Sequence, residues 1–114
     1  MATKKQIPAP VEQPEAPKLQ AINQVHLVGR LAADPQIRET TTGKSVATLR
    51  LAINDGKATT YLNVVAWEDL ASLAAGFHSG DAVDVTGRIR SRSWDSPDGK
   101  RYAVEVVAST LAAA

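Results

Sequence analysis

Arginine and tryptophan alternate along residues 87–94, which read Gly-Arg-Ile-Arg-Ser-Arg-Ser-Trp. Side chains alternate between two faces of a β-strand, so one face of this stretch presents three guanidinium groups and an indole, from Arg88, Arg90, Arg92 and Trp94. Guanidinium groups bind phosphate oxygens, and aromatic rings stack on bases. The stretch therefore predicts a surface for an extended polyanion with stackable bases. The alternative is a solvated strand face, on which Arg88 pairs with Asp84.

Two more aromatic side chains are predicted on an outward face. The alternation over residues 59–67 directs Tyr61 and Trp67 away from the core, next to a strand at 46–54 that carries Arg50 outward. The chain has only two Trp, two Tyr and one Phe, and a core would ordinarily bury such scarce rings. The predicted nucleic-acid-binding residues, including a lysine in the turn after residue 54, are Tyr61, Trp67, Trp94, Arg50, Arg88, Arg90, Arg92 and Lys57.

These side chains need a sheet to position them. Period-two patterns predict five strands, at 23–31, 46–54, 59–67, 82–94 and 101–110. Apolar residues at helical spacing predict one short helix over 68–77. Three strands, a helix and two strands fit an all-β, five-stranded Greek-key barrel with the helix between strands three and four. This is the OB fold, which commonly binds oligonucleotides or oligosaccharides on the face of strands two and three.

Composition limits the remaining possibilities. The chain has 114 residues, enough for one small domain, which we place at 22–111 with a short end at 112–114. Four prolines within residues 1–21 predict a disordered, proline-rich tail. Residues 23–114 contain ten basic and ten acidic side chains, so attraction to a polyanion must come from local arrangement.

Several functional classes are not expected. The chain has no cysteine, and His26 has no companion ligand nearby, so we predict no metal site and no cofactor. Asp95 and Asp98 belong to a turn, and Ser, His and Asp show no catalytic spacing, so we predict no enzyme. No apolar run approaches the ~20 residues of a membrane span, and the N-terminus lacks the apolar segment of a secretory signal.

The first predicted strand also suggests self-association. His26 and Val28 lie on the face opposite its core residues, and an exposed valine beside a sheet edge would be an unused apolar position in a monomer. We therefore predict an oligomer interface at His26 and Val28.

Several segments together resemble the bacterial single-stranded DNA-binding protein (SSB) family. The first of them, residues 23–35, reads N-Q-V-H-L-V-G-R-L-A-A-D-P. The other matching segments are residues 42–47, 49–54, 61–71, 80–94 and 98–108. The resemblance implies an OB fold, sequence-tolerant binding of single-stranded DNA in replication, recombination or repair, and a homo-oligomer, with a tetramer favoured over a dimer. It implies base stacking at Tyr61, Trp67 and Trp94. It also implies a cytoplasmic, nucleoid-associated protein of a bacterial or phage-infected cell.

Two of the departures from the family pattern bear on function. The loop between strands two and three is only residues 54–57, whereas family members often have a longer, basic and aromatic one. The acidic C-terminal tip by which the family recruits replication proteins has no counterpart before Ala114, so we do not expect such recruitment. These departures favour one alternative function, an OB-fold accessory factor of the primosome type that mainly binds protein and binds nucleic acid weakly.

Overall fold

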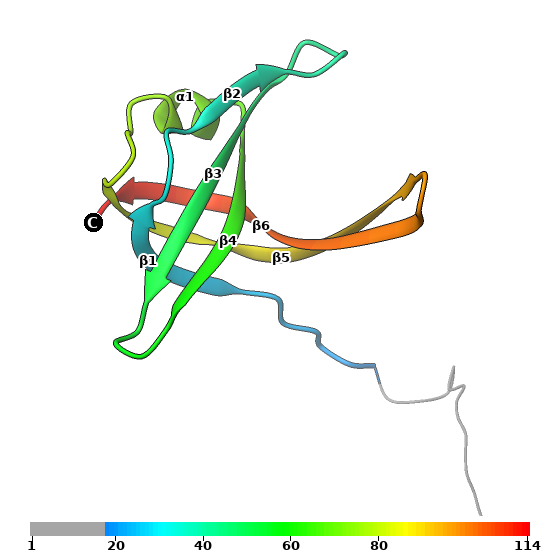
Figure 1. Cartoon of the computed structure of the whole chain (residues 1–114), viewed down its shortest axis with the longest axis horizontal. Coiled ribbons are helices and arrows are strands. Elements are labelled where there is room, and N and C mark those ends of the chain that lie inside the picture. The colour runs from blue at the N-terminus through cyan, green and yellow to red at the C-terminus, as the bar shows by residue number, and fades with distance from the viewer. Residues whose placement is uncertain (1–17) are drawn as a thin grey trace, which may run out of the picture.

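The strands of this chain form one sheet that closes on itself (Figure 1). The structure is a computed structural model that describes residues 18–114. Within these residues the elements are β1 (Val25–Leu31), β2 (Gln36–Glu39), β3 (Ser45–Asn54), β4 (Thr59–Trp67), α1 (Asp69–Ala74), β5 (Ala82–Ser96) and β6 (Gly99–Ala113). No helix among them is long and apolar enough to cross a membrane.

The pairing order is β1-β5-β6-β4-β3-β2, and a further pairing of β1 with β3 closes the ring. Neighbouring strands run antiparallel except β4 and β6, which run parallel where Val64 is opposite Val106. At the closure, Arg30 and Leu31 of β1 are opposite Ala52 and Leu51 of β3. This arrangement confirms the predicted all-β barrel with one helix inserted after the strand that ends at Trp67.

The barrel interior is filled by the aliphatic side chains that period two directs inward. The largest fully buried ones are Leu49, Leu51, Val64, Val83, Val85 and Val106. Helix α1 packs against β3, β4 and β6, and its Ala71 and Ala74 are completely buried. The helix is shorter than predicted, because the amides of Gly76 and Phe77 bond to carbonyls three residues back and tighten the chain into a turn.

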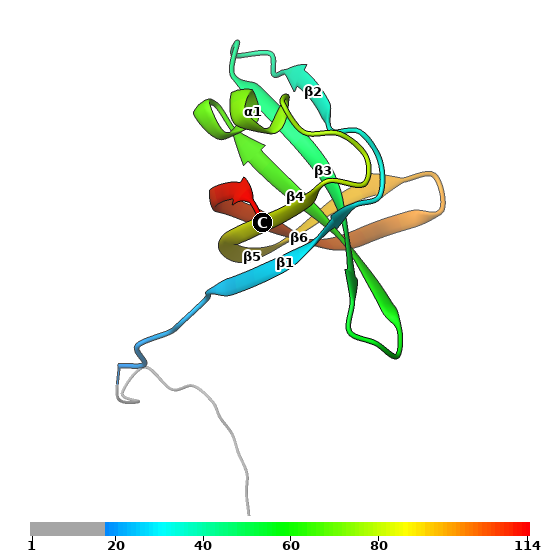
Figure 2. The same cartoon turned by 90° about the vertical axis from the view of Figure 1, so that its left-hand side faces the viewer.

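Two hairpins extend beyond the barrel (Figures 1 and 2). One joins β3 to β4. The other is formed by the fifteen-residue strands β5 and β6, which pair down to Ser96 and Gly99 at the turn. Both of these strands are longer than predicted, because the pairing continues through the turn-flanking residues and to Ala113.

At the base of the β5–β6 hairpin, two backbones approach so closely that position 87 requires glycine. The register shifts between Thr86 and Gly87, leaving Ser109 as an extra residue on β6, and Ser109 Oγ donates a hydrogen bond to the Thr86 carbonyl. A Cβ on Gly87 would lie 2.2 Å from the Val107 carbonyl oxygen, so no larger residue fits there without backbone movement. The bulge lies on β6, so the alternation along β5 is uninterrupted.

The sequence-based predictions missed strand β2, and the structure describes only the end of the predicted N-terminal tail. Strand β2 is not predicted, because all four of its residues are exposed and show no apolar alternation. The predicted proline-rich tail lies outside the described residues apart from 18–21, which form neither helix nor strand.

Candidate nucleic-acid interface

The β5–β6 hairpin carries a ring and two arginines on one face. The Arg92 guanidinium carbon lies over the Trp94 ring, 4.7 Å from the ring centroid, as expected for residues two apart on a strand. Arg90 and Arg92 both reach Glu105, which is directly opposite Arg90 on β6. Of the predicted shared face of Arg88, Arg90, Arg92 and Trp94, the last three lie together, and Glu105 completes the group.

Glu105 divides its two carboxylate oxygens between the arginines. Oε2 accepts hydrogen bonds from Arg90 Nε at 3.2 Å and from the Arg90 terminal nitrogen, and Oε1 accepts one from Arg92 Nε at 3.1 Å. The Glu105 side chain is only 7% exposed, whereas the arginine side chains are 40% and 52% exposed. We call these three residues the arginine fork.

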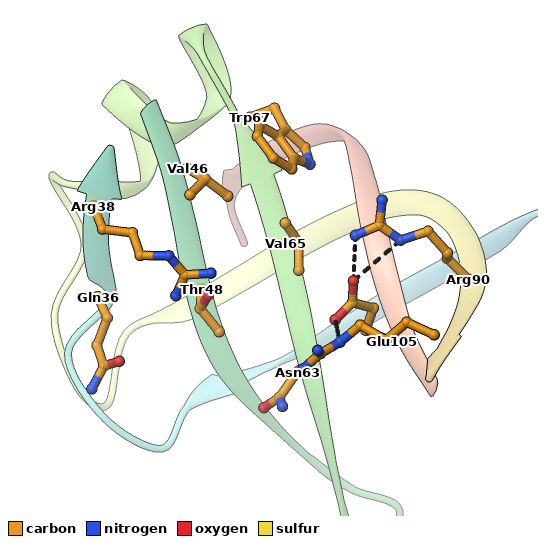
Figure 3. Close-up of a pocket in the computed structure, with 10 residues that line it drawn as sticks. Gln36, Arg38, Val46, Thr48, Asn63, Val65, Trp67, Arg90 and Glu105 are labelled. Atoms are coloured by element: carbon orange, nitrogen blue, oxygen red, sulfur yellow. Dashed lines mark hydrogen bonds and ion pairs between the residues drawn. The ribbon is translucent and has the colours of Figure 1, made fainter. Parts of the chain in front are cut away.

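Trp67 borders a hollow of about 260 Å³ beside the fork (Figure 3). Its apolar lining is Trp67 with Val46 and Val65, on adjacent strands β3 and β4. The polar and charged lining residues are Gln36, Arg38, Thr48, Asn63, Arg90, Arg92 and Glu105. An indole over aliphatic side chains, surrounded by amides, a hydroxyl and arginines, can accept a flat ring and the phosphates attached to it.

Tyr61 lies further along β4 and also carries an arginine. The Arg50 guanidinium carbon is 5.4 Å from the Tyr61 ring centroid, and Arg50 donates a 3.0 Å hydrogen bond to Asn63 Oδ1. A second hollow, lined by Ala33, Asp34, Gln36, Thr48, Arg50 and Asn63, shares Gln36, Thr48 and Asn63 with the Trp67 hollow. The two hollows are thus continuous along the outer face of β2, β3 and β4. Together they carry four arginines and two carboxylates.

Lys57 lies at the tip of the β3–β4 hairpin, away from the hollows. The backbone amides of Lys57 and Ala58 donate hydrogen bonds to Asp55 Oδ1 at 3.0 and 3.1 Å. These bonds, the one from Lys57 first, lower the pKa of Asp55. The carboxylate next to Lys57 is therefore ionised near neutral pH and offsets its charge.

Arg88 is separated from the other predicted arginines. It lines a different hollow, with Asn23, Gln24 and residues around the β6 bulge. The predicted alternative of an Arg88–Asp84 pair is wrong, because Asp84 Oδ1 lies 2.8 Å from His26 Nε2 instead. Arg88 is thus an exposed cation outside the continuous hollow.

His26 and Val28 lie on the outer face of β1, as predicted. Val28 is 52% exposed. Strand β1 pairs with β5 along Val25–Arg30, but on its other side it pairs with β3 only at Arg30 and Leu31. Among the described strands, most of that side of β1 is therefore a free edge, available for pairing with another chain.

Sequence reasoning missed part of this surface. Gln36 and Arg38 belong to the unpredicted strand β2, and Thr48 lies on an outward face where polar residues are ordinary. Glu105 could have been found, because a turn that pairs Ser96 with Gly99 places Arg90 opposite Glu105.

Most of the described chain is similar to proteins of one known family. Residues 22–113 match the model of the "Single-strand binding protein family". Over 91 residues the chain is 43% identical to a protein named single-stranded DNA-binding protein from Thermus thermophilus, covering 75% of this chain and 35% of that protein. Over 99 residues it is 41% identical to one of the same name from Streptococcus pneumoniae, covering 79% and 64%.

A solved structure is also similar. The crystal structure of wild-type single-stranded DNA binding protein from Thermus aquaticus superimposes with a TM-score of 0.71 at 35% identity, covering 82% of this chain and 40% of that one. The chain thus spans about a third to two-fifths of the length of the Thermus proteins it matches.

Proposed function

This chain belongs to the single-strand binding protein family, and we propose that it binds single-stranded DNA without strong sequence preference. Bases stack on Tyr61, Trp67 and Trp94, and arginines next to those rings contact the phosphates. The family is named for binding, and we propose no catalysed reaction.

The observation that carries the proposal is the line of rings and cations on one surface. Arg50 lies over Tyr61, Arg92 lies over Trp94, and Trp67 borders the continuous hollow with the arginine fork beside it. Stacking of a base on an aromatic side chain contributes about 1–3 kcal/mol and tolerates any base. Three rings therefore supply on the order of 3–9 kcal/mol before the cost of ordering the strand is subtracted.

The alternation of rings and guanidinium groups explains why sequence preference is expected to be weak. Arginines that contact phosphates position the strand and carry no information about the bases. The amides of Gln36 and Asn63 are the lining groups that can contact base edges, and we expect them to adjust preference only modestly. The protein then covers exposed single strands during replication, recombination or repair, in the cytoplasm of a bacterial or phage-infected cell, as its bacterial relatives suggest.

We also propose that the chain acts as a homo-oligomer, with a tetramer favoured over a dimer. Val28 and the free edge of β1 support an interface between copies, because an unpaired strand edge with an exposed valine is otherwise a liability in water. His26 on the same face is held by Asp84 and would lie at that interface.

A titration with oligo(dT) tests the DNA-binding proposal. Both tryptophans of the chain are proposed stacking residues, so their fluorescence should be quenched on binding. The affinity should fall steeply as salt increases, because phosphate contacts release counterions. A duplex of the same length is the control, since its bases are not free to stack. Unchanged tryptophan fluorescence, or binding that is insensitive to salt, would reject the proposal and favour an accessory factor that binds protein.

A further inference from the structure

Glu105 is the only buried charged side chain in the part of the chain that the structure describes. A buried carboxylate is costly unless it is paired and hydrogen-bonded. Both of its oxygens accept from guanidinium groups, so its burial is satisfied entirely by Arg90 and Arg92. The proposed binding function gives no role to a carboxylate on a surface that must attract phosphates, so its presence there needs an explanation.

The charges of the fork do not act independently. Two guanidinium groups and one carboxylate sum to a single positive charge, and the carboxylate is the buried member. If both arginines turned to phosphates, Glu105 would be left buried and unpaired. Glu105 cancels one of the two guanidinium charges, so the fork acts toward DNA as one cation, even though Arg92 bonds to Glu105 only through Nε and its terminal nitrogens can still reach a phosphate.

Arg92 has a second constraint. Its Nε is bound to Glu105 while its guanidinium group covers one face of Trp94. A base that stacks on Trp94 without displacing the arginine must then use the opposite ring face. Glu105 thus fixes, through Arg92, which face of the indole is offered.

We propose that Glu105 is a positioning residue: it withholds one arginine charge from DNA and holds Arg92 against one face of Trp94. The inference rests on the proposed binding of single-stranded DNA. A purely structural salt bridge would stabilise the hairpin without changing either the number of phosphate contacts or the accessibility of the ring.

The first test is Glu105→Gln, measured as the salt dependence of oligo(dT) binding. The amide oxygen can keep Arg90, which lies directly opposite on β5, and its NH₂ group repels Arg92, which leaves Trp94 and becomes available to a phosphate. The slope of log affinity against log salt should steepen by about 0.7, the value for one single-strand contact. Over a tenfold range of salt, the affinity relative to the unmodified chain should change about fivefold.

Asp95→Asn is the matched control. Asp95 is on the same hairpin, one residue beyond Trp94 and on the opposite face, and its partner Lys100 is exposed. The substitution changes the net charge by the same amount but does not touch the fork. Its slope should equal that of the unmodified chain.

A second variant decides the point if Glu105→Gln does not fold. The double variant Arg90→Gln with Glu105→Gln removes a pair of opposite charges and leaves Arg92 as the single cation. If the fork acts as one cation, the salt slope is unchanged. If Arg90 and Arg92 are independent phosphate contacts, the slope falls by about 0.7 and the inference is wrong.

A measurement without DNA tests the geometry alone. With Trp67→Phe as background, Trp94 is the only tryptophan, and acrylamide quenching reports access to its ring. Adding Glu105→Gln should increase the quenching, because Arg92 no longer covers one face of the ring. Equal quenching would overturn the role of Glu105 in holding Arg92 against Trp94.

If the unmodified chain does not bind oligo(dT), the proposed function fails and the inference with it. If it binds and Glu105→Gln leaves its slope unchanged, only the role of Glu105 fails.

Discussion

Removing the Trp94 ring should weaken DNA binding without weakening the fold. Trp94 lies on the β5–β6 hairpin beyond the barrel and is 41% exposed, so Trp94→Ala creates no cavity in the core. Its loss removes one stacked base, about 1–3 kcal/mol. At about 1.4 kcal/mol per factor of ten, the Kd for oligo(dT) should rise about 5-fold to about 150-fold. Because Arg92 lies over one face of the ring, we expect the base to stack on the other face.

The assay is the fluorescence anisotropy of a labelled oligo(dT), since the substitution removes one of the two intrinsic reporters. Tyr102→Ala is the matched control. Tyr102 is 74% exposed on the same hairpin, but it is opposite Ser93 and therefore lies on the face away from Trp94. It should leave the Kd nearly unchanged, and both variants should melt within a few degrees of the unmodified chain. Equal losses of affinity for the two variants would refute the assignment of a single binding face.

Three further outcomes are expected. Arg92→Ala should weaken binding to all single-stranded sequences about equally and reduce the salt slope by about 0.7, because Glu105 then neutralises Arg90; an unchanged slope would place Arg92 outside the site. Light scattering should give a mass well above the single-chain 12.1 kDa, and Val28→Lys should lower it by charging the β1 edge; a single-chain mass for the unmodified protein would reject the oligomer. Gly87→Ala should destabilise the fold by about 1–3 kcal/mol in thermal melting, because its Cβ meets the Val107 carbonyl. Gly76→Ala, whose nearest contact is at 3.5 Å, is the control, and equal melting temperatures would contradict the packing argument.

The barrel could be predicted from the sequence because its strands alternate cleanly. Leu49 and Leu51 on β3 and Val83 and Val85 on β5 are buried as period two requires. The pattern becomes less informative where a strand leaves the barrel. Ile89 continues the inward series of β5 but is 46% exposed, because the hairpin at that point no longer has a core beneath it. Period two identifies a face, and only the tertiary structure decides what covers that face.

The rings of the candidate site could be predicted, but the ion pairs around them could not. Tyr61 and Trp94 lie outside the core as expected, and each carries an arginine from its own face. The partners of the arginines depend on cross-strand register, which alternation does not supply. Arg90 and Arg92 are therefore held by Glu105, and Arg88 is left by itself near the bulge. The short strand β2, with Arg38, has no sequence signal at all.

Charge placement explains how a nearly neutral domain can attract a polyanion. Residues 23–114 carry equal numbers of acidic and basic side chains, so the domain has no net charge to attract a polyanion from a distance. At physiological ionic strength charges are screened beyond about 8 Å, so arginines act on phosphates mainly at contact distance. An exposed carboxylate within that distance would repel the strand. The fork avoids this repulsion at one carboxylate: it buries Glu105 behind two guanidinium groups, so that the fork is cationic even though one of its three charges is negative. Asp34, the other carboxylate of the hollows, is exposed and accepts a hydrogen bond from the Ser79 amide.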